Sequence, residues 1–148
     1  MTEPTEQSAP IVLDTNIILD LFVFKDPATI SLQQALDSGA YHWIATQPMR
    51  DELERVLTYK HIAPRIAFHQ LTAGSILAQF DKFAALKPVA CKASVTCKDP
   101  DDQKFIDLAV AHKSLLLSKD HAVLCMAKRL VALDVDVKTQ LKVSIVVP

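Results

Sequence analysis

Short apolar runs alternate along this chain with longer stretches whose apolar positions follow helical spacing. The short runs are typical of strands buried on both faces of a parallel sheet. They occur at residues 10–13, 41–45, 115–117 and 142–147, with a weaker candidate at 88–91. Strands that alternate with helices predict βαβ units. The pattern therefore predicts an α/β protein of three α/β/α layers around a central, mostly parallel sheet.

The helical stretches are bounded by proline, glycine and capping residues. Pro27, Pro48 and Pro64 suit the first turns of helices, and Gly39 suits a helix end. We expect helices at 17–22, 27–39, 48–57, 64–86, 99–113 and 121–130. Residues 1–9 are predicted to be a flexible N-terminal tail, and residues 10–148 a single domain.

Composition excludes several classes of protein. The two glycines leave no P-loop or dinucleotide-binding motif. The three cysteines match no zinc spacing, and the polar N-terminus does not resemble a secretory signal. No apolar run approaches the roughly 18 residues of a membrane span, so we expect a cytoplasmic protein. The net charge of −1 predicts that any contact with nucleic acid is local, through metal ions or a small basic patch.

Four acidic residues lie just after predicted strands or at the starts of predicted helices. Asp14 and Asp120 follow the strands at 10–13 and 115–117, while Glu52 and Asp102 lie in the first turns of helices. Ligands of open α/β sheets bind at the carboxyl ends of the strands. Oxygen-rich clusters suit Mg²⁺ or Mn²⁺, which can activate a water and neutralise a phosphodiester.

Each of these acidic residues also has an ordinary structural interpretation. An Asp after a strand is more often a turn or capping residue than a ligand. The segment 99–102 (DPDD) could serve only as a helix cap. Within it, Asp101 could replace or assist Asp102, and Asp99 is a further candidate. Taken singly, each structural interpretation is the better one; the joint pattern favours a metal site.

Four motifs together resemble those of the PIN-domain family, over roughly residues 10–125. The first is IVLDTNIILD (11–20), with Asp-Thr-Asn after the first strand. PMRDELERVL (48–57) is similar to the second motif, with Glu before Leu. CKDPDDQKFIDLA (97–109) resembles the third motif of the VapC-like branch of toxin ribonucleases, and LLLSKD (115–120) resembles the fourth.

The resemblance implies a PIN-like fold and a site for Mg²⁺ or Mn²⁺. Carried over by position, the metal-binding and catalytic residues would be Asp14, Glu52, Asp102 and Asp120. Asn16 and Ser118 resemble supporting residues, with Asp99 and Asp101 less certain. The implied activity is hydrolysis of single-stranded or loop RNA by the toxin of a toxin–antitoxin pair. The implied partners are RNA, an antitoxin protein and a second copy of the chain in a homodimer.

Other acidic α/β proteins fit the sequence less well. A response-regulator receiver needs an acidic pair after its first strand, whereas Asp14 stands alone before Thr15. A haloacid-dehalogenase phosphatase needs Asp-x-Asp there, but residue 16 is Asn. The stronger alternative is a catalytically inactive PIN-like module that binds RNA or protein, which would have no need for four clustered acids.

Overall fold

The computed structural model describes residues 8–141, with five parallel strands in one sheet. The predicted strand at 142–147 and most of the predicted tail lie outside the described residues. The strand order is β3-β2-β1-β4-β5, with every neighbouring pair parallel. The strands are β1 (Ala9–Leu13), β2 (Tyr41–Ala45), β3 (Ala84–Leu86), β4 (Leu115–Leu117) and β5 (Val137–Lys138). The expectation of a mostly parallel sheet is confirmed.

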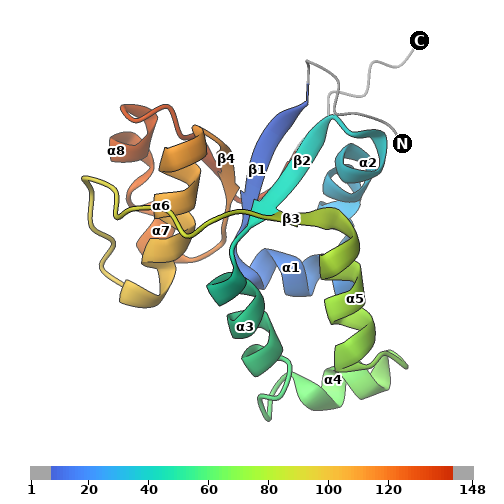
Figure 1. The fold of residues 1–148 in the computed structure, drawn as a ribbon. Coiled ribbons are helices and arrows are strands. Elements are labelled where there is room, and N and C mark those ends of the chain that lie inside the picture. Colours follow the sequence, from blue (N-terminus) through green and yellow to red (C-terminus); the bar gives the residue numbers. More distant parts are fainter. Residues whose placement is uncertain (1–7, 142–148) are drawn as a thin grey trace.

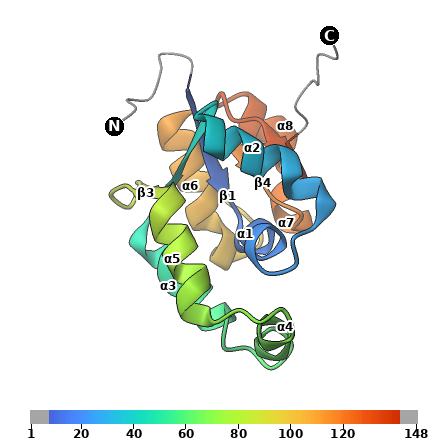
Figure 2. The ribbon, with the colours of Figure 1, turned by 90° about the vertical axis from the view of Figure 1, so that its right-hand side faces the viewer.

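Helices cover both faces of this sheet and extend beyond one of its edges (Figures 1 and 2). α6 packs on β1 and β4, and α2 packs on β2 from the opposite face. In Figure 1, α3, α4 and α5 extend below the carboxyl ends of the strands. The helices are α1 (Thr15–Phe22), α2 (Ile30–Ser38), α3 (Gln47–Val56), α4 (Ala63–Phe68), α5 (Ala73–Phe83), α6 (Gln103–His112), α7 (His121–Leu124) and α8 (Ala127–Val131), with 3-10 turns η1 (Pro27–Thr29) and η2 (Pro100–Asp102). This confirms the three-layer α/β/α architecture.

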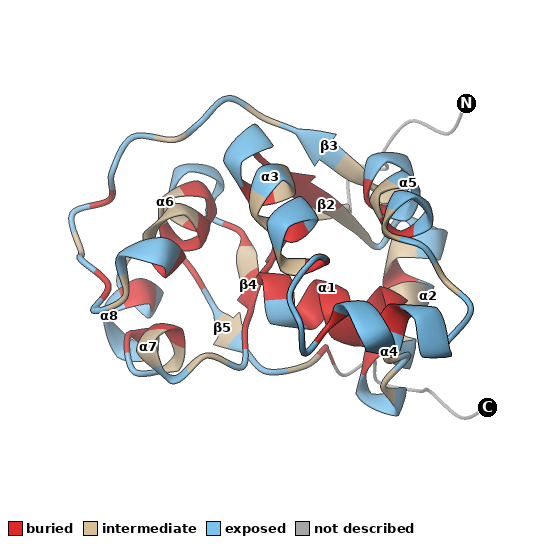
Figure 3. Ribbon diagram, turned by 90° about the horizontal axis from the view of Figure 1, so that it is seen from below, coloured by how far each residue is buried: buried red, intermediate tan, exposed pale blue. Residues whose placement is uncertain are grey.

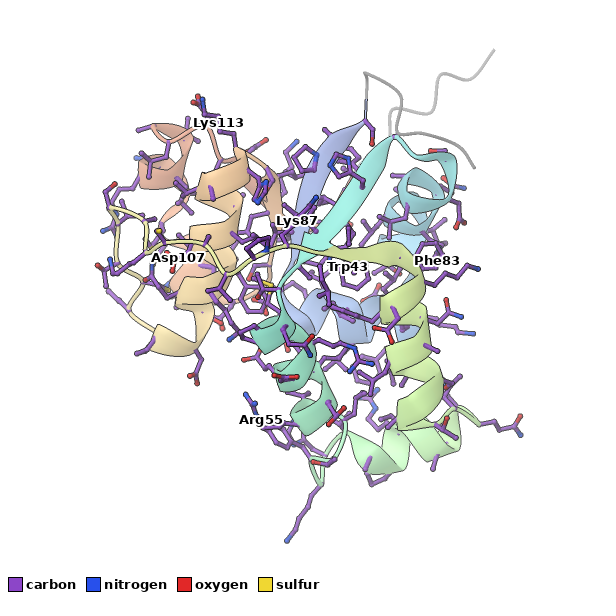
Figure 4. All side chains as sticks on the ribbon, viewed as in Figure 1. Trp43, Arg55, Phe83, Lys87, Asp107 and Lys113 are labelled. Atoms are coloured by element: carbon purple, nitrogen blue, oxygen red, sulfur yellow. The ribbon has the colours of Figure 1, made fainter. Side chains whose placement is uncertain are left out.

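The core lies where the central strand meets its helices. Ile11, Val12 and Leu13 of β1 are at most 1% exposed, and the first helix, α1, is buried along almost its whole length (Figure 3). On β2, Trp43 meets the Phe80 ring of α5 edge-on at 4.9 Å. In Figure 4 this tryptophan points from the sheet toward α5 and Phe83. Aromatic packing therefore anchors α5 to the sheet.

The predicted helix at 64–86 is wrong, because the chain breaks at residues 69–72. Gln70 adopts a positive φ of 60°, and Thr72 then caps a new helix through a reciprocal capping box with Ser75. The last residues of the predicted helix, Ala84–Leu86, instead form β3 beside β2. The predicted helix at 121–130 is likewise divided into α7 and α8.

The predicted strand at 88–91 is also wrong, because residues 87–99 form an irregular strap across α6. Asp107 accepts a hydrogen bond from the backbone N–H of Ala93 at 2.9 Å. The Gln103 amide contacts Cys97 N at 2.7 Å and Val95 O at 3.0 Å. Side chains of α6 thus make the hydrogen bonds to the strap backbone that a neighbouring strand would otherwise make. The strap ends at η2.

Every helix described between residues 8 and 141 is too short or too polar to cross a lipid bilayer.

Candidate metal centre

The central strands β1 and β4 end side by side, and each is followed by an aspartate. The chain leaves β1 toward β2 on one side and returns as β4 on the other, so the strand order reverses between them. Such a switch point is where open α/β sheets bind ligands. The backbone N–H of Asp14 donates to Leu117 O at 3.0 Å, which fixes Asp14 beside the end of β4. Asp120 follows three residues later as the N-cap of α7.

The third aspartate, Asp102, is the last residue of η2, the 3-10 turn that follows the strap. Asp99 begins this 3-10 turn, and its carboxylate accepts the N–H of Asp101 at 3.0 Å. The turn leaves Asp101 exposed and buries Asp102, which is 7% exposed. The structure therefore gives Asp99 a capping position and brings Asp102, rather than Asp101, to the ends of β1 and β4.

Asp14, Asp102 and Asp120 form a tight acidic cluster. One carboxylate oxygen from each residue lies within 4.8 Å of those from the other two. Asp14 and Asp102 are buried, and Asp120 is partly buried. Two carboxylates about 4 Å apart repel by roughly 4 kcal/mol at an effective dielectric near 20. If all three carboxylates were ionised without a cation, they would repel one another.

Within this cluster, Asp102 has a strongly raised pKa. Burial, hydrogen bonding with the Asp120 side chain and repulsion from Asp14 raise the pKa of Asp102 to about 8. Burial also raises the pKa of Asp14, although a hydrogen bond from the Ser118 hydroxyl and one from the backbone of Asn16 act against it. A cation among these oxygens would remove the repulsion and favour all three charged forms.

The three side chains fit a small divalent ion. Within residues 8–141, the buried Oδ2 atom of Asp102 has no hydrogen-bond partner, which leaves it available to a ligand. Because the three oxygens lie within 4.8 Å of one another, the three side chains together could hold one small ion. Carboxylate oxygens are the ligands that Mg²⁺ and Mn²⁺ prefer.

Ser118 ties two of the aspartates together. Its hydroxyl donates to Asp14 Oδ2 at 2.6 Å and accepts the backbone N–H of Asp120 at 3.0 Å. The side chain is fully buried at the end of β4. Its single hydroxyl therefore orients one carboxylate and sets the start of the loop that carries another. Asn16 is exposed beside the cluster, and its side chain makes no hydrogen bond within the described part of the chain.

Glu52 of α3 lies in the same cleft but outside the three-residue cluster. The Thr15 hydroxyl donates to its Oε2 atom at 2.5 Å, and Lys104 Nζ donates to its Oε1 atom at 2.9 Å. Lys104 also donates to the backbone oxygen of Asp101. Both oxygens of Glu52 are thus held by α1 and α6, which places this carboxylate at the border of the cluster.

Sequence reasoning missed Lys104 and Thr15. Lys104 lies in the first turn of α6, where the helix dipole disfavours a cation. A lysine at that position, two residues after Asp102, was the signal that it had an acidic partner. Thr15 carried no such signal, because its hydroxyl meets Glu52 across 37 residues of sequence.

Comparison with models of protein families gives a match. A family model described as the PIN domain matches residues 10–122, which span β1 to α7 and include every residue of the acidic cluster. The chain belongs to the PIN-domain family. PIN domains are a nuclease fold whose members generally bind divalent metals, and the buried acidic cluster of this chain fits such a site. No curated protein sequence gives a significant match.

The acidic cluster of this PIN domain opens into a cleft of about 410 Å³. Asp14, Asp102 and Asp120 line one part of it, together with Glu52. The remainder is lined by α1, by Asp101 and by the C-terminal part of α3 with the turn that follows, which includes Tyr59 and His61. The cleft therefore joins a strongly acidic part to one with cationic and aromatic side chains.

Most basic residues near the motifs are already paired. Arg50 makes two hydrogen bonds to Asp81, at 2.8 and 2.9 Å. Lys119 pairs with Asp20, and the Arg65 guanidinium lies 4.1 Å from the centre of the Phe24 ring. The side chain of Arg55 has no hydrogen bond or ion pair among residues 8–141, and it lines the cleft.

Proposed function

We propose that this protein is a Mg²⁺- or Mn²⁺-dependent ribonuclease that hydrolyses phosphodiester bonds of single-stranded or loop RNA. The observation that carries the proposal is the convergence of Asp14, Asp102 and Asp120, together with the buried Oδ2 atom of Asp102, which has no hydrogen-bond partner among the described residues. The family match supports a nuclease. A purely structural role would not require three repelling carboxylates at the ends of β1 and β4.

In this proposal the three aspartates hold the ion, and Glu52 contributes at longer range. A bound Mg²⁺ or Mn²⁺ would supply the acidity that activates water and the charge that offsets the phosphate in the transition state. Ser118 keeps Asp14 turned toward the site by donating to its Oδ2 atom. Lys104 and Thr15 hold Glu52 in one orientation. As the family resemblance implies, the products would carry a 5′-phosphate and a 3′-hydroxyl.

The decisive experiment compares Asp14→Asn with a matched surface variant, Asp136→Asn. Asp136 has a side chain 60% exposed at the start of β5 and does not line the cleft. Cleavage of single-stranded RNA in Mn²⁺ is expected to fall more than about a hundredfold in Asp14→Asn only, since even indirect metal partners cost ten- to a hundredfold. The thermal shift caused by Mn²⁺ should disappear in the same variant.

Undiminished cleavage by Asp14→Asn would refute this proposal. If neither wild type nor Asp136→Asn responds to Mn²⁺ or cleaves RNA, the catalytically inactive binding module becomes the better description.

The third motif supports a narrower role as the toxin of a toxin–antitoxin pair, through its resemblance at residues 97–109. Induced expression in bacteria is then expected to arrest growth, and Asp14→Asn should relieve the arrest. An antitoxin would be a small protein that enters the acidic cleft, and a homodimer would be seen by analytical ultracentrifugation. Wild-type expression without any effect on growth would count against the toxin role and leave the nuclease role intact.

A further inference from the structure

The turn between α3 and α4, residues 57–62, presents two exposed rings to the cleft. Tyr59 is 45% exposed, and His61 is exposed beside it, with 5.9 Å between the ring centres and a tilt of 36°. Both residues line the same cleft as the acidic cluster. The two rings lie side by side at the cleft and offer an apolar face beside polar groups.

This α3–α4 turn is firmly held, which keeps the rings in place. The buried side chains Leu57 and Ile62, 2% and 5% exposed, anchor its two ends. The carbonyl of Tyr59 accepts the N–H groups of Ile62 and Ala63, at 2.9 and 2.8 Å. The N–H of Tyr59 itself donates to Val56 O at 3.1 Å. The backbone that carries the two rings is therefore preorganised, which lowers the conformational entropy lost when a ligand binds.

Arg55 supplies a cation next to the rings. It projects from the C-terminal part of α3, on the side away from α5 (Figure 4). The Thr58 hydroxyl bonds to its backbone oxygen at 2.6 Å, while the guanidinium is left for a ligand. Carboxylates line the same cleft, and they repel a phosphate unless a cation covers them. An anionic ligand would therefore enter with a phosphate near Arg55.

We propose that Arg55, Tyr59 and His61 form a subsite that binds one unstacked base of single-stranded RNA together with its phosphate. A planar π-face suits the rings, a phosphate suits the guanidinium, and a nucleotide presents both. Duplex RNA keeps its bases stacked and cannot offer one to Tyr59. The subsite therefore selects single strands and loops, and it places the backbone beside the acidic cluster. This inference rests on the proposed ribonuclease function, whose substrate it specifies.

The test measures binding apart from cleavage. Fluorescence anisotropy with labelled single-stranded RNA in EDTA gives the dissociation constant, because no cleavage is expected without metal. Tyr59→Ala should weaken binding about tenfold, and Tyr59→Phe should retain most of the affinity. Binding of duplex RNA should be the same in Tyr59→Ala and wild type. Arg55→Ala should weaken binding to both RNAs, with a smaller dependence on salt.

Phe68→Ala is the matched control. Phe68 is 82% exposed and also lies beside a histidine, His69, at 5.3 Å, but neither residue lines the cleft. Its removal should leave affinity for RNA unchanged. Crosslinking of RNA containing 4-thiouridine gives a second measurement for weak binding, with the crosslink expected within residues 55–61 in wild type and absent in Tyr59→Ala.

Equal affinity of Tyr59→Ala and wild type for single-stranded RNA, with the crosslink elsewhere, would overturn the subsite. The two proposals also fail separately. A protein that cleaves RNA with Mn²⁺ but is unaffected by Tyr59→Ala retains the nuclease and loses the subsite. A protein that loses binding in Tyr59→Ala, yet shows no response to Mn²⁺ and no cleavage, retains the subsite and loses the nuclease.

Discussion

The two parts of the cleft are built in opposite ways. The acidic cluster is buried and joins three separate segments, after β1, in η2 and after β4. The α3–α4 turn is exposed and comes from a few consecutive residues. Buried charges depend on the whole fold for their spacing, whereas an exposed turn depends on its own hydrogen bonds. Substitutions in the cluster should therefore affect chemistry and stability together, and substitutions of the exposed rings in the turn should affect mainly RNA binding.

The largest expected effect is that of Asp102→Asn, which should separate activity from stability. Cleavage should fall more than about a hundredfold, since a ligand of the ion is lost. Stability of the metal-free protein should rise, because the amide carries no charge to bury. With Tm sensitive to about 2–4 °C per kcal/mol at this size, we expect a gain of at least about 4 °C at pH 8. Differential scanning fluorimetry in EDTA measures it.

The same substitution should remove a pH dependence. The folded pKa of Asp102, about 8, lies above the ordinary value of 3.8, so between those values the folded state holds a proton that the unfolded state releases. Stability of the metal-free wild type should therefore fall as pH rises from about 4 to 8. The penalty is absent below this window and complete above it. Identical pH profiles for wild type and Asp102→Asn would contradict the assignment.

The next effect compares two buried serines at opposite ends of β4. Ser118→Ala removes the hydroxyl that orients Asp14, and cleavage should fall about ten- to a hundredfold. Ser114→Ala is the matched control, because Ser114 is 1% exposed and its hydroxyl has no hydrogen-bond partner in the part of the chain that the structure describes. Steady-state cleavage rates in Mn²⁺ measure both. Equal losses in the two variants would mean that packing of β4, rather than orientation of Asp14, determines the rate.

A smaller effect is expected where the cluster meets α6. Lys104→Met removes the cation paired with Glu52, so the cleft becomes more negative and should bind Mn²⁺ about fivefold more tightly. Cleavage should decrease, since Glu52 is then held by Thr15 alone. Calorimetric titration gives the affinity, and Lys128→Met, at an exposed position of α8, is the control. Unchanged affinity for Mn²⁺ would show that Lys104 exerts no field at the cluster.

The smallest effect belongs to the turn. Thr58→Val removes the 2.6 Å hydrogen bond to Arg55 O, which should lower Tm by about 2 °C, since a net hydrogen bond contributes about 1 kcal/mol. Affinity for single-stranded RNA should fall less than cleavage falls in Ser118→Ala. Thr58→Ser keeps the hydroxyl and should behave as wild type. A loss of Mn²⁺ binding in Thr58→Val would show that the turn and the acidic cluster do not act independently.

The sequence predicted those features that follow from the spacing of apolar residues and from aspartates placed directly after strands. The apolar runs of β1, β2 and β4 required a parallel sheet, and Asp14 and Asp120 then had to lie at its carboxyl edge. The break near Gln70 was not predictable from apolar spacing, because its φ of 60° leaves no hydrophobic signature. Contacts between polar residues far apart in the sequence, such as Thr15 with Glu52, leave no periodic pattern from which they could be predicted.

The strap of residues 87–99 separates the chain into two parts, and each part supplies a portion of the acidic cluster. Asp14 lies before the strap, and Asp102 and Asp120 lie after it, so the acidic cluster exists only where β1 and β4 pair. Val89 within the strap is 67% exposed, at a point where a backbone cut severs no strand pairing. Two fragments separated by a cut at Val89 should assemble into a working site when mixed, while each fragment alone would carry an incomplete site.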